Sequence, residues 1–150
     1  MEDSFKMETR IKIDQVEQAG YKAILGLEKF IESTPLTRIH KDLIKIRASQ
    51  VNGCAFCIDM HTRDARNSGE TEQRIYSLNA WRDTPFFTDE ERAILALTEE
   101  VTLISNHVKD KTYQNVLDLL GESYLAQVIL AIITINAWNR IGIATQLMPK

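Results

Sequence analysis

The chain has 150 residues, of which 44% are hydrophobic and 26% are charged, a composition that excludes a disordered or fibrous protein and fits one compact domain. Its net charge of −3 and pI near 5.6 exclude the basic surface that binding to a phosphate backbone requires, so no nucleic-acid partner is expected. With only 6 glycines and 3 prolines, it lacks the turn residues of an all-β fold, and long helices are expected.

Helix signals dominate the whole chain. After a short extended start at Ile11 and Ile13, apolar residues recur at the spacing of an amphipathic helix, and Asn52-Gly53 is a typical helix stop. Seven helices are predicted, at about 15–32, 36–51, 54–67, 71–81, 89–104, 110–120 and 123–146. No repeat, low-complexity tract or linker divides them. The fold class is therefore predicted as all-α, in a single compact domain covering residues 1–150.

The segment Thr88–Glu91 marks the start of the fifth predicted helix. The Thr88 hydroxyl can accept from the Glu91 amide while the Glu91 carboxylate reaches back to the Thr88 amide, which is the arrangement of a capping box. The acidic residues also suit the positive end of the helix dipole. This run of acids is therefore interpreted as a helix start and not as an acid–base site. Asp110 is expected to cap the sixth helix.

Residues 123–139 carry no charged side chain and form the most apolar stretch of the chain. A membrane span needs roughly 20 predominantly apolar residues, and this stretch is shorter and contains polar side chains, so a buried core or subunit-contact helix is predicted. Residues 1–6 are acidic and polar where a secretory signal would be basic and then apolar. A cytoplasmic location without membrane attachment is expected, where ordinary thiols stay reduced.

The informative motif is a C-x-x-C pair, Cys54 and Cys57, followed four residues later by His61. A domain of this size buries enough surface to fold without disulfides, so the cysteines are not needed as staples. Cys57 falls in the first turn of the predicted third helix, where free backbone amides and the helix dipole favour a thiolate. Residues four apart share a helix face, so His61 can come within reach of Cys57 and act as its base.

This spacing nominates Cys57 as the activated nucleophile and Cys54 as the residue that resolves the oxidised product as a disulfide. No βαβ pattern surrounds the pair, which distinguishes it from the thioredoxin arrangement. A histidine base usually needs a third group that fixes its tautomer. Asp64 on the same helix and Asp42 on the preceding helix are both candidates, and spacing alone does not choose between them.

The segment DLIKIRASQVNGCAFCIDMH, residues 42–61, resembles the core motif of the AhpD-like alkylhydroperoxidases, within the carboxymuconolactone decarboxylase family. The likeness continues through residues 62–81 and 135–140, so it covers most of residues 15–148. It implies an all-helical fold, assembly into trimers or hexamers, and reduction of peroxides by a cysteine pair that a partner dithiol protein recharges. No cofactor or metal ion is expected.

The resemblance also implies a role for each site residue. In the family the second cysteine is attacked by peroxide, the first cysteine resolves, the histidine is the base, and an upstream glutamate completes a proton relay. The first three roles fall on Cys57, Cys54 and His61. Asp42, one methylene shorter, stands at the position of the glutamate, and Phe56 stands where the alkylhydroperoxidase has a second histidine. The decarboxylase branch lacks the cysteine pair, so decarboxylation is not expected.

Other interpretations of the motif stay open. Cys54, Cys57 and His61 could be zinc ligands, although the sequence shows no fourth ligand at a paired spacing. The cysteines could instead be small core side chains. A redox sensor, or a protein-disulfide oxidoreductase that acts in a stress-linked interaction, would use the same pair. Trp81 and Trp138 could line a substrate cleft, although aromatic residues at helical spacing are more often core.

The preferred hypothesis is a cytoplasmic, homo-oligomeric thiol peroxidase. A hydroperoxide would oxidise Cys57, Cys54 would close the disulfide, and an external dithiol protein would restore the reduced pair. His61 would take the thiol proton, and Asp42 would complete the relay.

Overall fold

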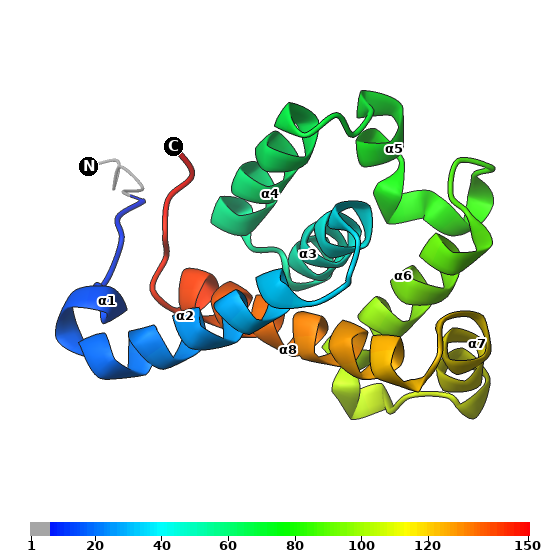
Figure 1. Cartoon of the computed structure of the whole chain (residues 1–150). Helices are drawn as coiled ribbons and strands as arrows, with labels where there is room; N and C mark the ends of the chain where they lie inside the picture. Colours follow the sequence, from blue (N-terminus) through cyan, green and yellow to red (C-terminus); the bar gives the residue numbers. More distant parts are fainter. Residues whose placement is uncertain (1–6) are drawn as a thin grey trace.

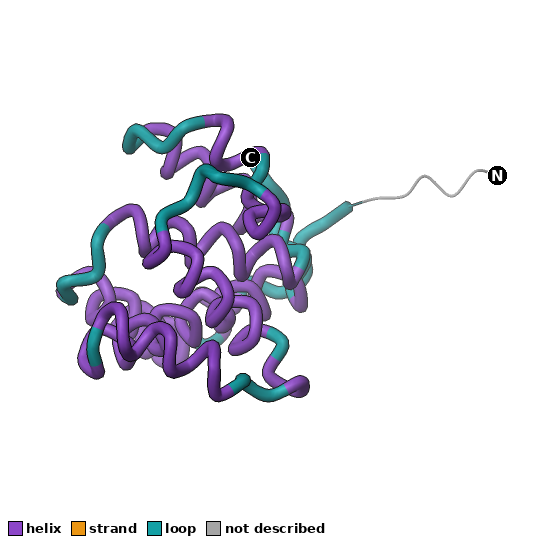
Figure 2. Tube along the Cα trace, turned by 90° about the vertical axis from the view of Figure 1, so that its right-hand side faces the viewer, coloured by secondary structure: helices purple, strands orange, loops and turns teal. Residues whose placement is uncertain are grey.

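In the computed structural model, which describes residues 7–150, the chain consists of helices and connecting loops (Figures 1 and 2). No strand occurs among these residues, so the all-α prediction is confirmed. The α-helices are α1 (Ile13–Val16), α2 (Gln18–Ser33), α3 (Arg38–Asn52), α4 (Ala55–Asn67), α5 (Glu72–Tyr76), α6 (Asp89–Thr102), α7 (Asp110–Leu120) and α8 (Glu122–Ala144). Two 3-10 helices, η1 (Leu78–Asp83) and η2 (Ile104–Asn106), follow α5 and α6. Residues 1–6, on which the prediction about an export signal rests, lie outside the described residues.

Helices α3, α6 and α8 form the centre of the bundle. Helix α3 packs against α4, α6 and α8, and α2 and α7 pack against α8 (Figure 1). Ile44, Ile94 and Ile132, one from each central helix, are fully buried in the main core, and burying such a side chain stabilises by roughly 1.5–3 kcal/mol. A second cluster contains Leu95 and Trp81. Trp81 is 4% exposed, which makes it a core residue and not part of a substrate cleft.

Helix α8 accounts for the most apolar stretch of the sequence. By length and composition alone it could cross a membrane. It instead lies across the bundle in contact with α2, α3, α6 and α7 (Figure 1). Leu125, Val128, Ile132 and Ile135 are each almost completely buried. Helix α8 is therefore a core helix. This agrees with the prediction made from the polar side chains that interrupt its apolar stretch.

Side-chain caps fix where several helices begin. The Thr88 hydroxyl accepts from the Glu91 amide at 3.1 Å, and Glu91 Oε1 accepts from the Thr88 amide at 2.8 Å, which confirms the predicted capping box. Thr37 and Thr71 accept in the same way from amides in the first turns of α3 and α5. These caps satisfy amides that would otherwise lack partners.

Several predicted helix boundaries were wrong by a residue or two, and two of them have a clear physical cause. Asp110 does not cap α7 but is its first residue, and Lys109 is the N-cap. The Lys109 amide donates to Glu100 Oε1 at 2.8 Å, so a carboxylate from α6 fixes this start through a contact distant in sequence. Ile13, predicted as extended, begins the short helix α1, because the amides of residues 15 and 16 bond the carbonyl of residue 12.

The predicted helix over residues 71–81 is interrupted after α5. Ser77 Oγ donates to the carbonyl of Gln73 at 2.6 Å, and Ser77 is the C-cap of α5. A serine that bonds the backbone locally competes with continuation of the helix. The chain therefore passes into η1, in which Ala80 has non-helical dihedral angles.

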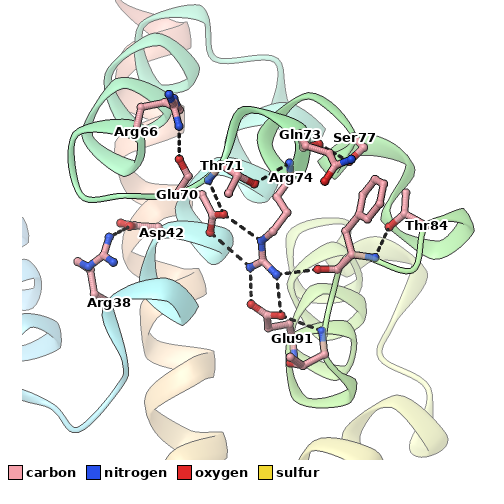
Figure 3. A network of polar contacts seen from close by, with 12 residues as sticks. Arg38, Asp42, Arg66, Glu70, Thr71, Gln73, Arg74, Ser77, Thr84 and Glu91 are labelled. Atoms are coloured by element: carbon pink, nitrogen blue, oxygen red, sulfur yellow. Dashed lines mark hydrogen bonds and ion pairs between the residues drawn. The ribbon is translucent and has the colours of Figure 1, made fainter.

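Arg74 of α5 connects the loop that follows α4 with the start of α6 (Figure 3). Its guanidinium donates to Glu70 Oε1 at 2.9 Å and to both carboxylate oxygens of Glu91, at 3.0 and 2.5 Å. It also donates to the carbonyl of Phe86 at 2.8 Å. The Glu70 and Glu91 side chains are only 7% and 5% exposed. Burial tends to raise the pKa of Glu91, but hydrogen bonds from Arg74 and Thr88 outweigh it and hold the pKa below its usual value.

Candidate active site

The turn between α3 and α4 presents the cysteine pair. Gly53 ends α3 with φ of 73°, a left-handed conformation that glycine adopts without steric cost. The amides of Gly53 and Cys54 both donate to the carbonyl of Ser49, at 2.9 and 3.0 Å. Cys54 is then the N-cap of α4, and its Sγ accepts from the Cys57 amide at 3.3 Å. Cys57 therefore lies in the first turn, at the positive end of α4, as the sequence predicted.

Cys54 and Cys57 are joined by a disulfide with an Sγ–Sγ distance of 2.07 Å. Their Cα atoms are 5.3 Å apart, within the ordinary range for a disulfide. The two residues are 1% and 2% exposed. Among residues 7–150, no three His, Cys, Asp or Glu side chains converge in a way that could hold a metal ion. The zinc interpretation concerns the reduced protein, in which the two sulfurs are not joined to each other.

A network of amide side chains, of which that of Asn139 is buried, holds this turn against α8. Asn52 Nδ2 donates to Asn136 Oδ1 at 3.0 Å and to Asn139 Oδ1 at 2.9 Å. Asn139 is completely buried and donates to Ser49 Oγ at 3.0 Å. Because Ser49 also accepts the amides of the turn, these bonds connect α8 to the backbone that carries Cys54.

Gly142 of α8 lies directly against the disulfide. A Cβ atom added to Gly142 would lie 2.9 Å from Cys54 Sγ and 3.4 Å from Cys57 Sγ. The shorter distance is well inside van der Waals contact, so glycine is required for α8 to approach this closely. No motif pointed to Gly142, because it is distant from the cysteines in sequence and only the packing of α8 on α4 brings them together.

Gly142→Ala is expected to destabilise the oxidised protein more than the reduced protein. In the disulfide the sulfur of Cys54 is held beside the new methyl group, whereas in the dithiol it can rotate to another rotamer. Overpacking costs roughly 1–3 kcal/mol, which makes the midpoint potential about 20–60 mV more positive for a two-electron couple. Redox titration against glutathione buffers measures this shift.

Gly26→Ala in α2 is the matched control, since a Cβ at Gly26 would meet nothing within 4 Å. It is expected to stabilise the protein by up to about 1 kcal/mol and to leave the potential unchanged. A potential in Gly142→Ala that equals that of the wild type would contradict the expected clash with Cys54.

His61 lies one helical turn after Cys57 on α4, as the spacing predicted. The pKa of His61 is lowered from 6.5 to about 4, first by burial and then by the charge of Lys45, while Glu28 and Asp64 act in the opposite direction. The imidazole is therefore neutral at pH 7. A neutral imidazole has a nitrogen that can accept a proton, although the lowered pKa makes His61 a weaker base in the oxidised protein than a free imidazole.

Asp42 and Asp64 were the two candidates for the group that orients His61. Asp42 on α3 accepts from Arg38 Nη1 of the same helix at 3.3 Å (Figure 3). Burial raises the pKa of Asp42, and the nearby charge of Arg38 only partly opposes this rise. The hydrogen bonds found within residues 7–150 join neither aspartate to His61. A proton relay through Asp42 therefore stays a prediction.

A charged pair beside His61 was not assigned to the site from the sequence. Lys45 Nζ of α3 lies 3.2 Å from Glu28 Oε1 of α2, and Trp138 Nε1 of α8 donates to Glu28 Oε2 at 3.1 Å. Lys45 could have been found, because Lys45 and His61 stand equally far on either side of Gly53, where the helical hairpin turns. Nothing in the sequence pairs Glu28 with Lys45.

Lys45→Met is expected to raise the pKa of His61 toward its ordinary value of 6.5, because the substitution removes a nearby positive charge and leaves Glu28 in place. An NMR titration of the imidazole protons in the oxidised protein measures the pKa. Lys41→Met, also on α3, is the control, since Lys41 bonds the carbonyl of Glu32 and is expected to leave His61 unchanged. A His61 pKa that is unchanged or lower in Lys45→Met would contradict the expected role of Lys45.

Known proteins resemble the chain over nearly its full length. It is 47% identical over 139 residues to the uncharacterised protein YdfG of Bacillus subtilis, and the match covers 92% of this chain and 95% of YdfG. The crystal structure of a protein of unknown function from Agrobacterium tumefaciens, provisionally described as the antioxidant defence protein AhpD, matches with a TM-score of 0.92 and 34% identity, covering 95% of this chain and 99% of that one. The debrominase Bmp8 shares the fold, with a TM-score of 0.78 and 18% identity over 86% of this chain and 70% of that one.

The fold and the site define an all-helical protein with a C-x-x-C disulfide at the start of a helix. Residues 18–100 match the sequence profile of the carboxymuconolactone decarboxylase family, and the chain belongs to this family. The resemblance to AhpD-like proteins inferred from residues 42–61 is thereby confirmed.

Proposed function

We propose that the protein is a thiol peroxidase that reduces hydroperoxides through Cys57 and Cys54. The observation that carries the proposal is the disulfide at the start of α4, one helical turn before a histidine that is neutral at pH 7. A cysteine at the positive end of a helix, near a neutral base and a second thiol, has the features of a peroxide-reactive thiol. The provisional assignment of the Agrobacterium relative to antioxidant defence supports the same activity.

The proposed cycle begins with the reduced protein. His61 accepts the proton of the Cys57 thiol, and the thiolate attacks the terminal oxygen of the hydroperoxide. The O–O bond breaks, the sulfur becomes a sulfenic acid, and the leaving oxygen takes up a proton to depart as an alcohol or water. Cys54 then attacks the Cys57 sulfur, water leaves, and the disulfide closes. An external dithiol protein returns two electrons and becomes a disulfide itself. Asp42 is the residue proposed to complete the proton relay.

Steady-state peroxide consumption with a panel of dithiol donors tests the proposal. The wild-type protein is expected to consume many equivalents of an alkyl hydroperoxide when a suitable dithiol is supplied, and to stop after about one equivalent without it. A chain that consumes no peroxide with any donor would contradict the proposal.

A second candidate is a redox sensor or a protein-disulfide oxidoreductase that uses the same cysteines. The burial of both residues, at 1% and 2% exposure, favours the sensor, because limited access to the sulfurs slows their reduction by an external thiol. A sensor is expected to oxidise once and then remain oxidised in the presence of donors that sustain turnover in a peroxidase. The steady-state assay therefore separates the two functions.

The protein is also proposed to form a homo-oligomer, a trimer or a hexamer, in the cytoplasm. Large apolar side chains that remain 40–47% exposed on α2 and α8 support such an assembly, namely Leu25, Phe30 and Ile133. Exposed apolar surface on adjoining helices fits a contact between subunits. Sedimentation equilibrium measures the assembly directly.

A further inference from the structure

A pocket of about 270 Å³ lies where the start of α4 meets the end of α8 and the C-terminal segment. Its wall is mainly apolar and includes Cys54, Phe56, Gly142, Ile143, Leu147 and Met148. Of the two cysteines, Cys54 belongs to this wall and Cys57 does not. The pocket therefore distinguishes two sulfurs that have almost the same low exposure.

The contact with α8 also differs between the two sulfurs. Gly142 lines the pocket, and a Cβ there would lie closer to Cys54 Sγ than to Cys57 Sγ, at 2.9 Å against 3.4 Å. The Cys54 sulfur thus lies next to a residue of the pocket wall that carries no side chain. Of the two sulfurs, that of Cys54 is therefore the one nearer to the wall of the pocket.

Contacts between the two ends of the chain hold the C-terminal segment over this pocket. The Arg10 amide donates to the carbonyl of Thr145 at 2.7 Å, and Arg10 Nη1 donates to the carbonyl of Ala144 at 3.2 Å. The Leu147 amide donates to the carbonyl of Gly142 at 2.9 Å. The segment after α8 runs beside the N-terminal segment in Figure 1. The pocket is therefore a built feature that depends on residues far from the cysteine motif.

We propose that this pocket is the entrance for the reducing thiol and that the reductant attacks Cys54 Sγ, not Cys57 Sγ. The inference rests on the proposed function, because it concerns the step in which an external dithiol reduces the disulfide. It specifies which sulfur forms the mixed disulfide with the reductant and which residues line the entrance.

The step balances as an ordinary thiol–disulfide exchange. The thiolate of the reductant forms a bond to Cys54 Sγ, the bond between Cys54 and Cys57 breaks, and its electron pair leaves with Cys57 as a thiolate. The second thiol of the reductant loses its proton and attacks the reductant's own sulfur in the mixed disulfide, so that Cys54 leaves as a thiolate and is protonated. The reductant is oxidised by two electrons, and the protein disulfide is reduced by two.

Attack on Cys54 also determines which cysteine is released first for the next cycle. Cys57 is released first, as a thiolate, in the first turn of α4 where the helix dipole stabilises negative charge. Cys54 remains bound to the reductant until the second exchange. The peroxide-reactive sulfur is therefore restored before the resolving sulfur.

A trapping experiment on the wild-type protein identifies the attacked sulfur. The oxidised protein is mixed with 2-mercaptoethanol, a monothiol, and the reaction is quenched with iodoacetamide in its early phase. Tandem mass spectrometry of the peptide that contains both cysteines locates each group. The adduct of 2-mercaptoethanol is expected on Cys54 and the carbamidomethyl group on Cys57. The reverse pattern, or equal amounts of both patterns, would overturn the proposal.

A pocket variant tests the entrance itself. Ile143→Trp places a larger side chain in the pocket wall and is expected to slow reduction by 2-mercaptoethanol by about tenfold, a barrier increase of roughly 1.4 kcal/mol. Ile133→Trp is the matched control, because Ile133 is on the same helix with nearly the same exposure, 47% against 45%, and is not in the pocket wall. It also controls for an effect on assembly through α8. Equal rates of reduction by 2-mercaptoethanol in the two variants would overturn the proposal that this pocket is the entrance.

The outcomes separate this proposal from the proposed function. A protein that carries the adduct on Cys54 but consumes no peroxide would support the entrance and contradict the peroxidase. A protein that consumes peroxide but carries the adduct on Cys57 would support the peroxidase function. It would overturn the proposal that the reductant attacks Cys54 through the pocket.

Discussion

Cys57→Ser is expected to lose peroxide consumption completely, whereas Cys54→Ser is expected to consume about one equivalent and then stop. The difference follows from the two proposed roles. Without the Cys57 sulfur no sulfenic acid forms, because the other thiol is the N-cap residue and lies a turn farther from His61. Without the Cys54 sulfur the sulfenic acid forms but cannot be resolved within the chain.

A single-turnover assay with each reduced variant measures this difference. Residual peroxide gives the number of equivalents consumed, and a dimedone adduct on Cys57 of the Cys54→Ser variant identifies the sulfenic acid. Equal consumption by the two variants, or consumption by Cys57→Ser alone, would contradict the assignment of roles. Stoichiometric zinc in the purified reduced protein would instead favour the metal-site interpretation.

Arg74→Met is expected to lower the free energy of unfolding by about 3–5 kcal/mol. The substitution retains an unbranched side chain but removes the donors that Glu70 and Glu91 share. Both carboxylates are buried, so each loses its ion-pair partner where water cannot replace it fully. The carbonyl of Phe86 loses a hydrogen bond in the same variant. Equilibrium unfolding in urea, monitored by helical circular dichroism, measures the change.

Arg63→Met is the control for the removal of an arginine charge. Arg63 pairs with Asp59 on the exposed side of α4, and their side chains are 50% and 38% exposed. Its effect is expected to stay within about 1 kcal/mol, because exposed ion pairs contribute little. Similar losses in the two variants would show that Arg74 acts only as a surface charge and would contradict the role assigned to the buried cluster.

The local features of the site were predictable because each depends on residues close together in sequence. Gly53 ends α3 because its left-handed conformation closes the helix, and Cys54 follows as the N-cap of α4. The spacing of Cys54 and Cys57 is one helical turn, so both sulfurs were expected at the same helix end. The capping box at Thr88 and Glu91 was predictable for the same reason.

Features that depend on contacts between distant segments were not predictable. The start of α7 at Asp110 is fixed by a carboxylate on α6. The charge around His61 depends on Lys45 and Glu28, which come from α3 and α2. Helical periodicity says which face of a helix is apolar, but it does not say which helix packs against that face.

The sequence by itself determined that the protein is all-helical, that it carries its only two cysteines at a helix start, and that a histidine follows one turn later. It determined these because hydrogen bonds within a helix and its caps span only a few residues. The tertiary structure decided that Gly142 lies against the disulfide, that Cys54 lines a pocket, and that His61 is neutral. Those properties depend on burial, charge and excluded volume, which arise only when helices distant in sequence pack together.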